Sequence, residues 1–173
     1  HGILDIVKDP DVATRVTLQP VRELGVDAAI LFADLLIPLE AMGVPVRISP
    51  AEGPIIERPI RTPEDVGRLN PLDPERRLGF VLETIRRVRG KIDVPFIGFA
   101  GAPFTLASYM IEGGGSRNFI ETKKLMYQAP RAWNLLMQKI CAVLEPYLES
   151  QVAAGATAIQ VFDSWAGCLA VDD

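Results

Sequence analysis

The chain has 173 residues, of which 49% are hydrophobic and 23% charged, and its formal net charge is -4 at pH 7. This length and composition predict a single domain, residues 1–173, with a substantial buried core. The acidic balance argues against binding to nucleic acid or anionic membranes. A membrane span needs ~20 apolar residues, and the apolar runs here, such as 28–32 and 35–39, are separated by Asp34 and are shorter than that.

The residue types also limit the chemistry. The two cysteines, Cys141 and Cys168, cannot form a disulfide framework, which fits the cytoplasm or a plastid stroma. The one histidine is His1, so no histidine triad or Cys/His zinc cluster can be assembled, and we expect no metal site. Because His1 is not a methionine and the chain opens abruptly, we expect it to begin inside a larger protein.

The first predicted unit is a helix followed by a strand. Asp9-Pro10-Asp11 is typical of a helix start and Gly25 of its end, and Pro20 should kink or divide the helix between them. The apolar run 28–32 predicts a strand buried on both faces in a parallel sheet. Asp34 therefore lies at the carboxyl end of a strand.

Short extended segments follow. Residues 35–42 predict a short helix that ends at Gly43. Residues 44–48 and 55–60, separated by Pro50, predict an extended pair or hairpin rather than strands of the main sheet.

Two helices are expected before the next strand. Thr62 is a predicted N-cap, with Pro63 at the first helical position and Asp65 as its capping partner. A long helix should begin near Pro74 and bury one apolar face, while its arginines form a solvated face. The apolar face consists of Leu78, Val81, Leu82, Ile85 and Val88.

The most informative stretch is 96–115. Residues 94–99 predict a strand that breaks at Gly101, Pro103 begins a helix, and the helix stops at the glycines 113–115. A strand that ends in a glycine turn and passes into a helix is the unit on which α/β enzymes build their sites.

The last third predicts two helices and a strand. Residues 119–127 favour a short helix, and apolar residues from Trp133 to Leu148 follow a helical period up to Gly155. Cys141, beside this stripe, is most simply a small buried hydrophobe. Residues 158–162 predict a third buried strand.

A repeated sequence pattern relates the strands. It reads Gly25-x-x-Ala28-x-x-Leu31-Phe32-x-Asp34 in the first unit and Gly155-x-x-Ala158-x-x-Val161-Phe162-x-Ser164 in the third. Because side chains alternate along a strand, Asp34, Gly101 and Ser164 should converge at the carboxyl end of one parallel sheet, where such folds place their sites. Spacing alone thus predicts a parallel α/β domain.

Three segments carry a resemblance to a known family. Residues 30–36 read ILFADLL, 98–113 read GFAGAPFTLASYMIEG, and 160–167 read QVFDSWAG. They closely resemble uroporphyrinogen decarboxylase, over essentially the whole chain but only about the first half of the family's length. The resemblance implies an α/β fold of the (β/α)8 TIM-barrel type, of which this chain covers part, and a homodimer when full length. It also implies cofactor-free decarboxylation of the four acetate side chains of uroporphyrinogen to give coproporphyrinogen.

The family's invariant aspartate falls on Asp34. The resemblance implies that this catalytic carboxylate accepts hydrogen bonds from pyrrole N–H groups and stabilises positive charge as a ring is protonated. A carboxylate in an apolar cleft does this more strongly than water because the local dielectric is low. The structural alternative is that Asp34 only caps the turn after its strand.

The substrate-binding residues are assigned in the same way. The resemblance implies that Tyr109 and Ser164 bind substrate carboxylates, that Phe99 and Phe162 form apolar walls, and that Gly101 leaves room for the macrocycle. The structural alternatives are a core aromatic for Tyr109, a helix cap for Ser164 and ordinary core for the two phenylalanines.

Other features qualify the assignment. Asp163 lies on the opposite strand face from Ser164 and ranks lower as a site residue, and Arg117 is expected to be a surface arginine. The family's N-terminal arginine motif and C-terminal histidine region are not in this sequence, so we expect the chain alone to be inactive. The rival interpretations are a corrinoid-dependent zinc methyltransferase, which shares the barrel, and a non-catalytic paralogue.

Overall fold

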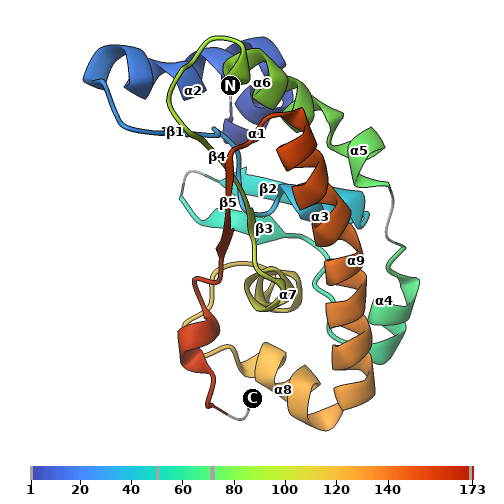
Figure 1. The fold of residues 1–173 in the computed structure, drawn as a ribbon. Helices are drawn as coiled ribbons and strands as arrows, with labels where there is room; N and C mark the ends of the chain where they lie inside the picture. Colours follow the sequence, from blue (N-terminus) through green and yellow to red (C-terminus); the bar gives the residue numbers. More distant parts are fainter. Residues whose placement is uncertain (1, 50, 71–72, 172) are drawn as a thin grey trace.

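The computed structural model describes residues 2–49, 51–70, 73–171 and 173. His1 and the predicted break at Pro50 lie outside these ranges. Within them, three parallel strands form a sheet in the order β1-β4-β5 (Figure 1). These strands are β1 (Ala29–Ile30), β4 (Phe96–Gly101) and β5 (Ala158–Phe162). The predicted parallel α/β arrangement is confirmed.

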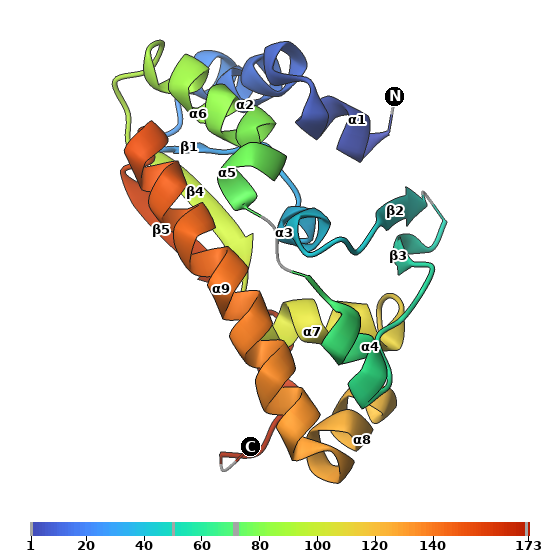
Figure 2. The same cartoon turned by 90° about the vertical axis from the view of Figure 1, so that its right-hand side faces the viewer.

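Helices occupy most of the remaining chain. They are α1 (Ile3–Lys8), α2 (Pro10–Leu24), α3 (Ile37–Ala41), α4 (Pro63–Arg68), α5 (Pro74–Arg77), α6 (Gly79–Arg89), α7 (Pro103–Glu112), α8 (Ile120–Gln128), α9 (Pro130–Ala154) and the 3-10 helix η1 (Ala166–Cys168). The long helix α9 runs alongside β4 and β5 (Figure 2), while α1, α2 and α6 gather near the amino ends of the strands.

The start and end of α2 follow from its sequence. Asp9 Oδ1 accepts hydrogen bonds from Asp11 N at 2.9 Å and Val12 N at 3.2 Å, and Gly25 ends the helix with φ 63°. Pro20 does not divide the helix, which is continuous from Pro10 to Leu24. A proline removes one intrahelical hydrogen bond, and packing of α2 against α6 preserves the helix around it.

The helix predicted from Pro74 is interrupted. Leu78 has φ -111° and ψ 19°, so α5 ends at Arg77 and α6 begins at Gly79. The predicted apolar face is nonetheless buried, because Leu78 itself is 0% exposed and the rest of the face continues along α6.

The predicted hairpin is present, as β2 (Val46–Ser49) and β3 (Gly53–Ile56), with Val46 opposite Ile56. It packs on the end of α7, where Ile56 N donates to Gly113 O at 2.8 Å. Gly113 has φ 90°, and a Cβ there would lie 3.0 Å from Pro59 Cγ, so this position requires glycine. The hairpin thus packs against the glycine that ends α7.

The capping box of α4 also forms as predicted. Thr62 Oγ1 accepts from Asp65 N at 3.2 Å, and Asp65 Oδ2 accepts from Thr62 N at 3.0 Å.

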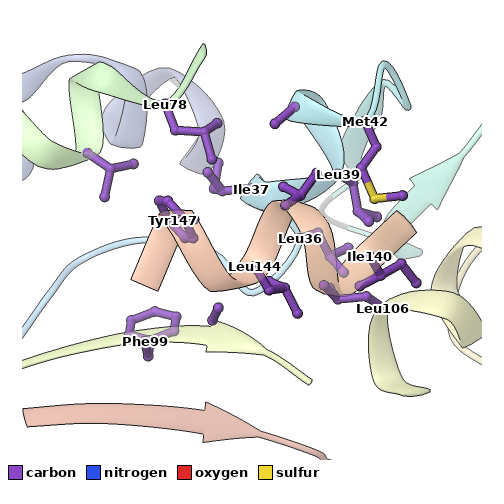
Figure 3. Close-up of a cluster of buried hydrophobic side chains, with 14 of the residues drawn as sticks. Leu36, Ile37, Leu39, Met42, Leu78, Phe99, Leu106, Ile140, Leu144 and Tyr147 are labelled. Atoms are coloured by element: carbon purple, nitrogen blue, oxygen red, sulfur yellow. The ribbon is translucent and has the colours of Figure 1, made fainter. Parts of the chain in front are cut away.

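The core lies between α9, the sheet and α3 (Figure 3). Leu144 and Tyr147 of α9 pack in one buried cluster with Phe99 of β4, Leu36 and Leu106. The helical period predicted for α9 is therefore the pattern of its buried face.

Burial of the sheet differs from the prediction. Ile30 is 58% exposed, Val161 42% and Phe162 39%, so β5 is not a buried strand and β1 is not buried on both faces. β5 is the last strand of the described sheet, with β4 on one side alone. Cys141 is exposed on α9 instead of buried. Among the described residues, no helix combines the length and apolarity needed to cross a bilayer.

Candidate active site

The carboxyl ends of the three strands meet at one edge of the sheet. Ile30 pairs with Ile97, and Gly101 pairs with Phe162, so all three strands run toward the same edge. β4 includes Gly101 instead of breaking there, and Ala102 N continues the pairing by donating to Phe162 O at 2.8 Å. The loops after these strands therefore lie at one edge of the sheet, where folds of this kind place their sites.

Asp34 is half-buried in the loop after β1. Its Oδ1 accepts a hydrogen bond from Leu36 N at 2.8 Å, so it caps the turn that leads into α3. Oδ2 has no hydrogen-bond partner within the described ranges. Burial raises the pKa of the Asp34 carboxyl above its ordinary value, while the Leu36 N–H acts in the opposite direction. The capping role and a free carboxylate oxygen thus coexist in this residue.

Tyr109 lies in the second turn of α7 and is half-buried. Burial raises its pKa, and the negative charge of Asp34 raises it further. The charge of Asp34 thus acts on Tyr109, although the two residues are far apart in sequence. At neutral pH the Tyr109 hydroxyl is therefore protonated and can donate a hydrogen bond.

Trp165 stacks on Tyr109, a contact that the sequence did not predict. Its ring lies 4.0 Å from the Tyr109 ring, measured between centroids, with 32° between the planes. It also lies 5.0 Å from the ring of Phe119. The signal available in the sequence was its place next to Ser164, within the segment that resembles the decarboxylase family.

The two phenylalanines meet edge to face, with ring centroids 5.6 Å apart and an interplanar angle of 80°. Phe99 is 8% exposed and belongs to the core cluster, whereas Phe162 presents 39% of its surface. A Cβ on Gly101 would lie 2.8 Å from Leu106 Cδ2 and 3.2 Å from Leu35 O. Packing within the chain thus disfavours a larger residue at 101, because its Cβ would crowd Leu106 and Leu35.

Ser164 is exposed in the turn after β5. It does not cap the following helix, because the N-cap of η1 is Trp165 and no side chain caps it. Asp163 accepts a hydrogen bond from Thr105 Oγ1 at 2.7 Å, which ties this turn to α7. Arg117 is exposed, as expected of a surface arginine.

At the candidate site, the side chains of Phe162 and Ser164 are exposed. A pocket of about 680 Å³ lies elsewhere, between the end of α3, the hairpin and α4, and none of the five predicted substrate-binding residues lines it. Across the described ranges, no group of three or more His, Cys, Asp or Glu side chains is placed to hold a metal ion.

Comparisons with known proteins give consistent results. The family model for uroporphyrinogen decarboxylase (URO-D) matches residues 1–173. The chain is 54% identical over 175 residues to "Uroporphyrinogen decarboxylase" of Carboxydothermus hydrogenoformans and 57% identical over 177 residues to the protein of that name from Solibacter usitatus. Each match covers 100% of this chain and 50% of the relative, so the chain spans about half the length of these curated relatives.

A solved structure shares the fold. A methyltransferase from Methanosarcina mazei superposes with a TM-score of 0.68 at 21% identity, over 93% of this chain and 50% of that one. Identity this low shows the fold alone, which is α/β of the (β/α)8 TIM-barrel type, with this chain matching half of the methyltransferase.

Proposed function

The chain belongs to the uroporphyrinogen decarboxylase family. We propose that it supplies Asp34 and the substrate-binding residues around it to an active site that converts uroporphyrinogen to coproporphyrinogen. In this proposal residues 1–173 form part of a single barrel domain in a cytoplasmic homodimer, and no cofactor takes part. The observation that supports it is that three adjacent parallel strands end at one edge of the sheet, so that Asp34 follows β1, α7 with Tyr109 follows β4, and Ser164 follows β5.

Asp34 has the central role. Loss of carbon dioxide from an acetate side chain leaves an electron pair, and a pyrrole ring protonated at carbon can accept it. A carboxylate beside the pyrrole N–H groups stabilises this cationic ring, and a half-buried site strengthens the interaction because less water screens it. The Asp34 oxygen not bound to Leu36 N is the one available for this role.

The surrounding side chains bind and orient the substrate. We assign Tyr109 and Ser164 to substrate carboxylates, since both carry hydroxyl donors at this edge of the sheet. Phe162, with its exposed ring, and Phe99 behind it supply an apolar wall for the macrocycle, next to Gly101. The likeness to a methyltransferase extends to the fold alone and does not favour methyl transfer.

An activity assay tests the proposal. The test uses a version that has the full length of the family. In it, Asp34→Ala should lower coproporphyrinogen formation by about 10²-fold, which is the scale of losing one preorganised electrostatic contact. The circular dichroism spectrum of the variant should remain native. The control is Asp27→Ala, at an exposed aspartate before β1, which should keep its activity. The 173-residue chain alone should give no product. Near-wild-type turnover by Asp34→Ala would remove Asp34 from the mechanism.

A further inference from the structure

The buried hydroxyl of Thr105 joins α7 to the turn that follows β5. Thr105 is 0% exposed at the third position of α7. Its Oγ1 donates to Asp163 Oδ1 at 2.7 Å and accepts from Trp165 N at 3.3 Å. Because Asp163 and Trp165 are the two neighbours of Ser164, one side chain holds the turn on both sides of that serine.

The same contacts bear on Tyr109. Tyr109 follows Thr105 by four residues on α7, so the two lie on the same face of the helix. The Trp165 backbone is bound to Thr105, and the Trp165 ring is stacked on the Tyr109 ring at 4.0 Å. The position of the turn therefore determines what covers Tyr109.

Phe119 holds Trp165 from another direction. Phe119 has φ 52°, the one positive φ outside glycine among the described residues, which is unfavourable for a bulky side chain. It is 5% exposed, its ring packs on Trp165, and its N–H donates to Ser116 Oγ at 3.1 Å. Trp165 thus contacts two rings that the surrounding structure holds in place.

We propose that Thr105 is a positioning residue of this site: its hydroxyl holds Ser164 and, through Trp165, the ring of Tyr109, so that the two carboxylate-binding hydroxyls keep a fixed separation. The identity of the substrate rests on the function proposed above. The geometric part does not, because it concerns contacts within the chain.

A purely structural role has a matched control. Thr84 is also buried, at 1% exposed, and its Oγ1 donates to Phe80 O at 2.9 Å within α6. Thr84→Val and Thr105→Val each remove one buried hydroxyl at constant volume. Only the second removes the link to the turn.

The first test needs no ligand and uses tyrosine ring resonances of the 173-residue chain. Stacking on Trp165 shifts the Tyr109 ring protons through the indole ring current. Thr105→Val should move them toward the position of an unstacked tyrosine, whereas Thr105→Ser and Thr84→Val should retain the wild-type position. Tyr147, buried in α9, is an internal reference.

Unchanged Tyr109 resonances in Thr105→Val would overturn the inference. If Thr105→Val does not fold, Asp163→Ala removes one side of the link from an exposed position and should produce a smaller shift in the same direction. No shift in that variant would contradict the inference equally.

The second test is a uroporphyrin titration of the same variants in a version that has the full length of the family, followed by quenching of tryptophan fluorescence. Thr105→Val should weaken binding by about tenfold, the scale of one hydrogen bond to a charged group, and Thr105→Ser should restore it. Binding that is unaffected by Thr105→Val would overturn the inference and leave the proposed function intact. No binding by any of the proteins would contradict the proposed function, and the Tyr109 resonances would then decide the inference alone.

Discussion

Asp34 shows how one residue can serve the fold and the chemistry together. Its Oδ1 binds the N–H of Leu36 and so orders the turn into α3, while the rest of the carboxylate is partly withdrawn from water. Burial of a charged group is unfavourable unless partners replace its hydration, and one N–H replaces only part of it. The folded chain therefore holds Asp34 at a cost in stability, which is common for functional residues.

A pH series on Asp34→Asn should reveal that cost. The pKa of Asp34 is raised in the folded state above its ordinary 3.8, so its contribution to stability is fully present below pH 3.8 and is lost as pH rises through the folded pKa. The asparagine amide can still accept from Leu36 N but never ionises. In urea unfolding, the variant should gain stability over the wild type between pH 3 and pH 7. A difference that does not change with pH would contradict this account.

At the scale of elements, cations from distant segments bind the carbonyls at two helix ends. Lys139 Nζ of α9 donates to the carbonyl oxygens of Val66 at 2.8 Å, Gly67 at 3.0 Å and Leu69 at 2.5 Å, at the end of α4. Arg61 Nε donates to Ile111 O at 3.1 Å near the end of α7. Positive charge is favourable at a helix C-terminus, where carbonyls lack intrahelical partners.

Lys139→Met should therefore destabilise the protein by about 2 kcal/mol, the scale of hydrogen bonds to a charged group, because methionine preserves the apolar stem and removes the ammonium. Urea unfolding measures this difference. Lys124→Met, at an exposed lysine of α8 whose ion pair to Glu121 spans 3.7 Å, should change stability by less than about 0.5 kcal/mol. Equal effects of the two substitutions would show that the three carbonyls do not depend on Lys139.

At the scale of the molecule, the sheet leaves apolar side chains exposed. Ile30, Val161 and Phe162 come from β1 and β5, the two outer strands of the described sheet. Exposed apolar surface commonly marks a region that binds something else. Val161 and Phe162 are consecutive on β5 and face opposite sides of the sheet, and Phe162 pairs with Gly101 at the carboxyl ends of the strands.

The 173-residue chain should accordingly bind the dye ANS, which fluoresces on exposed apolar surface. Ile30→Thr and Val161→Thr together should lower the fluorescence at least about twofold, since threonine keeps the β-branched shape that suits a strand and reduces apolar area. Leu24→Ser, at an isolated leucine that is 76% exposed at the end of α2, is the control and should have little effect. Equal loss in the control would mean that ANS does not report on the sheet.

The sequence by itself determined the features that arise from near neighbours. Asp9 and Gly25 bound α2, Thr62 and Asp65 begin α4, and Pro103 and Gly113 bound α7, because caps and breakers act on the backbone within a few residues. The helical period of the apolar residues in α9 and the family resemblance could also be read from the sequence.

Tertiary structure alone decided the features that depend on distant partners. The exposure of β5 depends on which elements lie beside and over it, and the residue pattern of a strand does not reveal those elements. The break at Leu78 was not visible, because the buried face runs through it without interruption. Gly101 is explained by contact with Leu106, which strand spacing does not reveal.

The candidate site divides in the same way. Asp34, Tyr109 and Ser164 could be named from motif positions, but the stacking of Trp165 on Tyr109 and the bridge made by Thr105 could not. These contacts join residues about 55–60 positions apart, and chain folding alone brings such residues together. The sequence therefore indicates which side chains carry the chemistry, and the tertiary structure decides which others hold them in place.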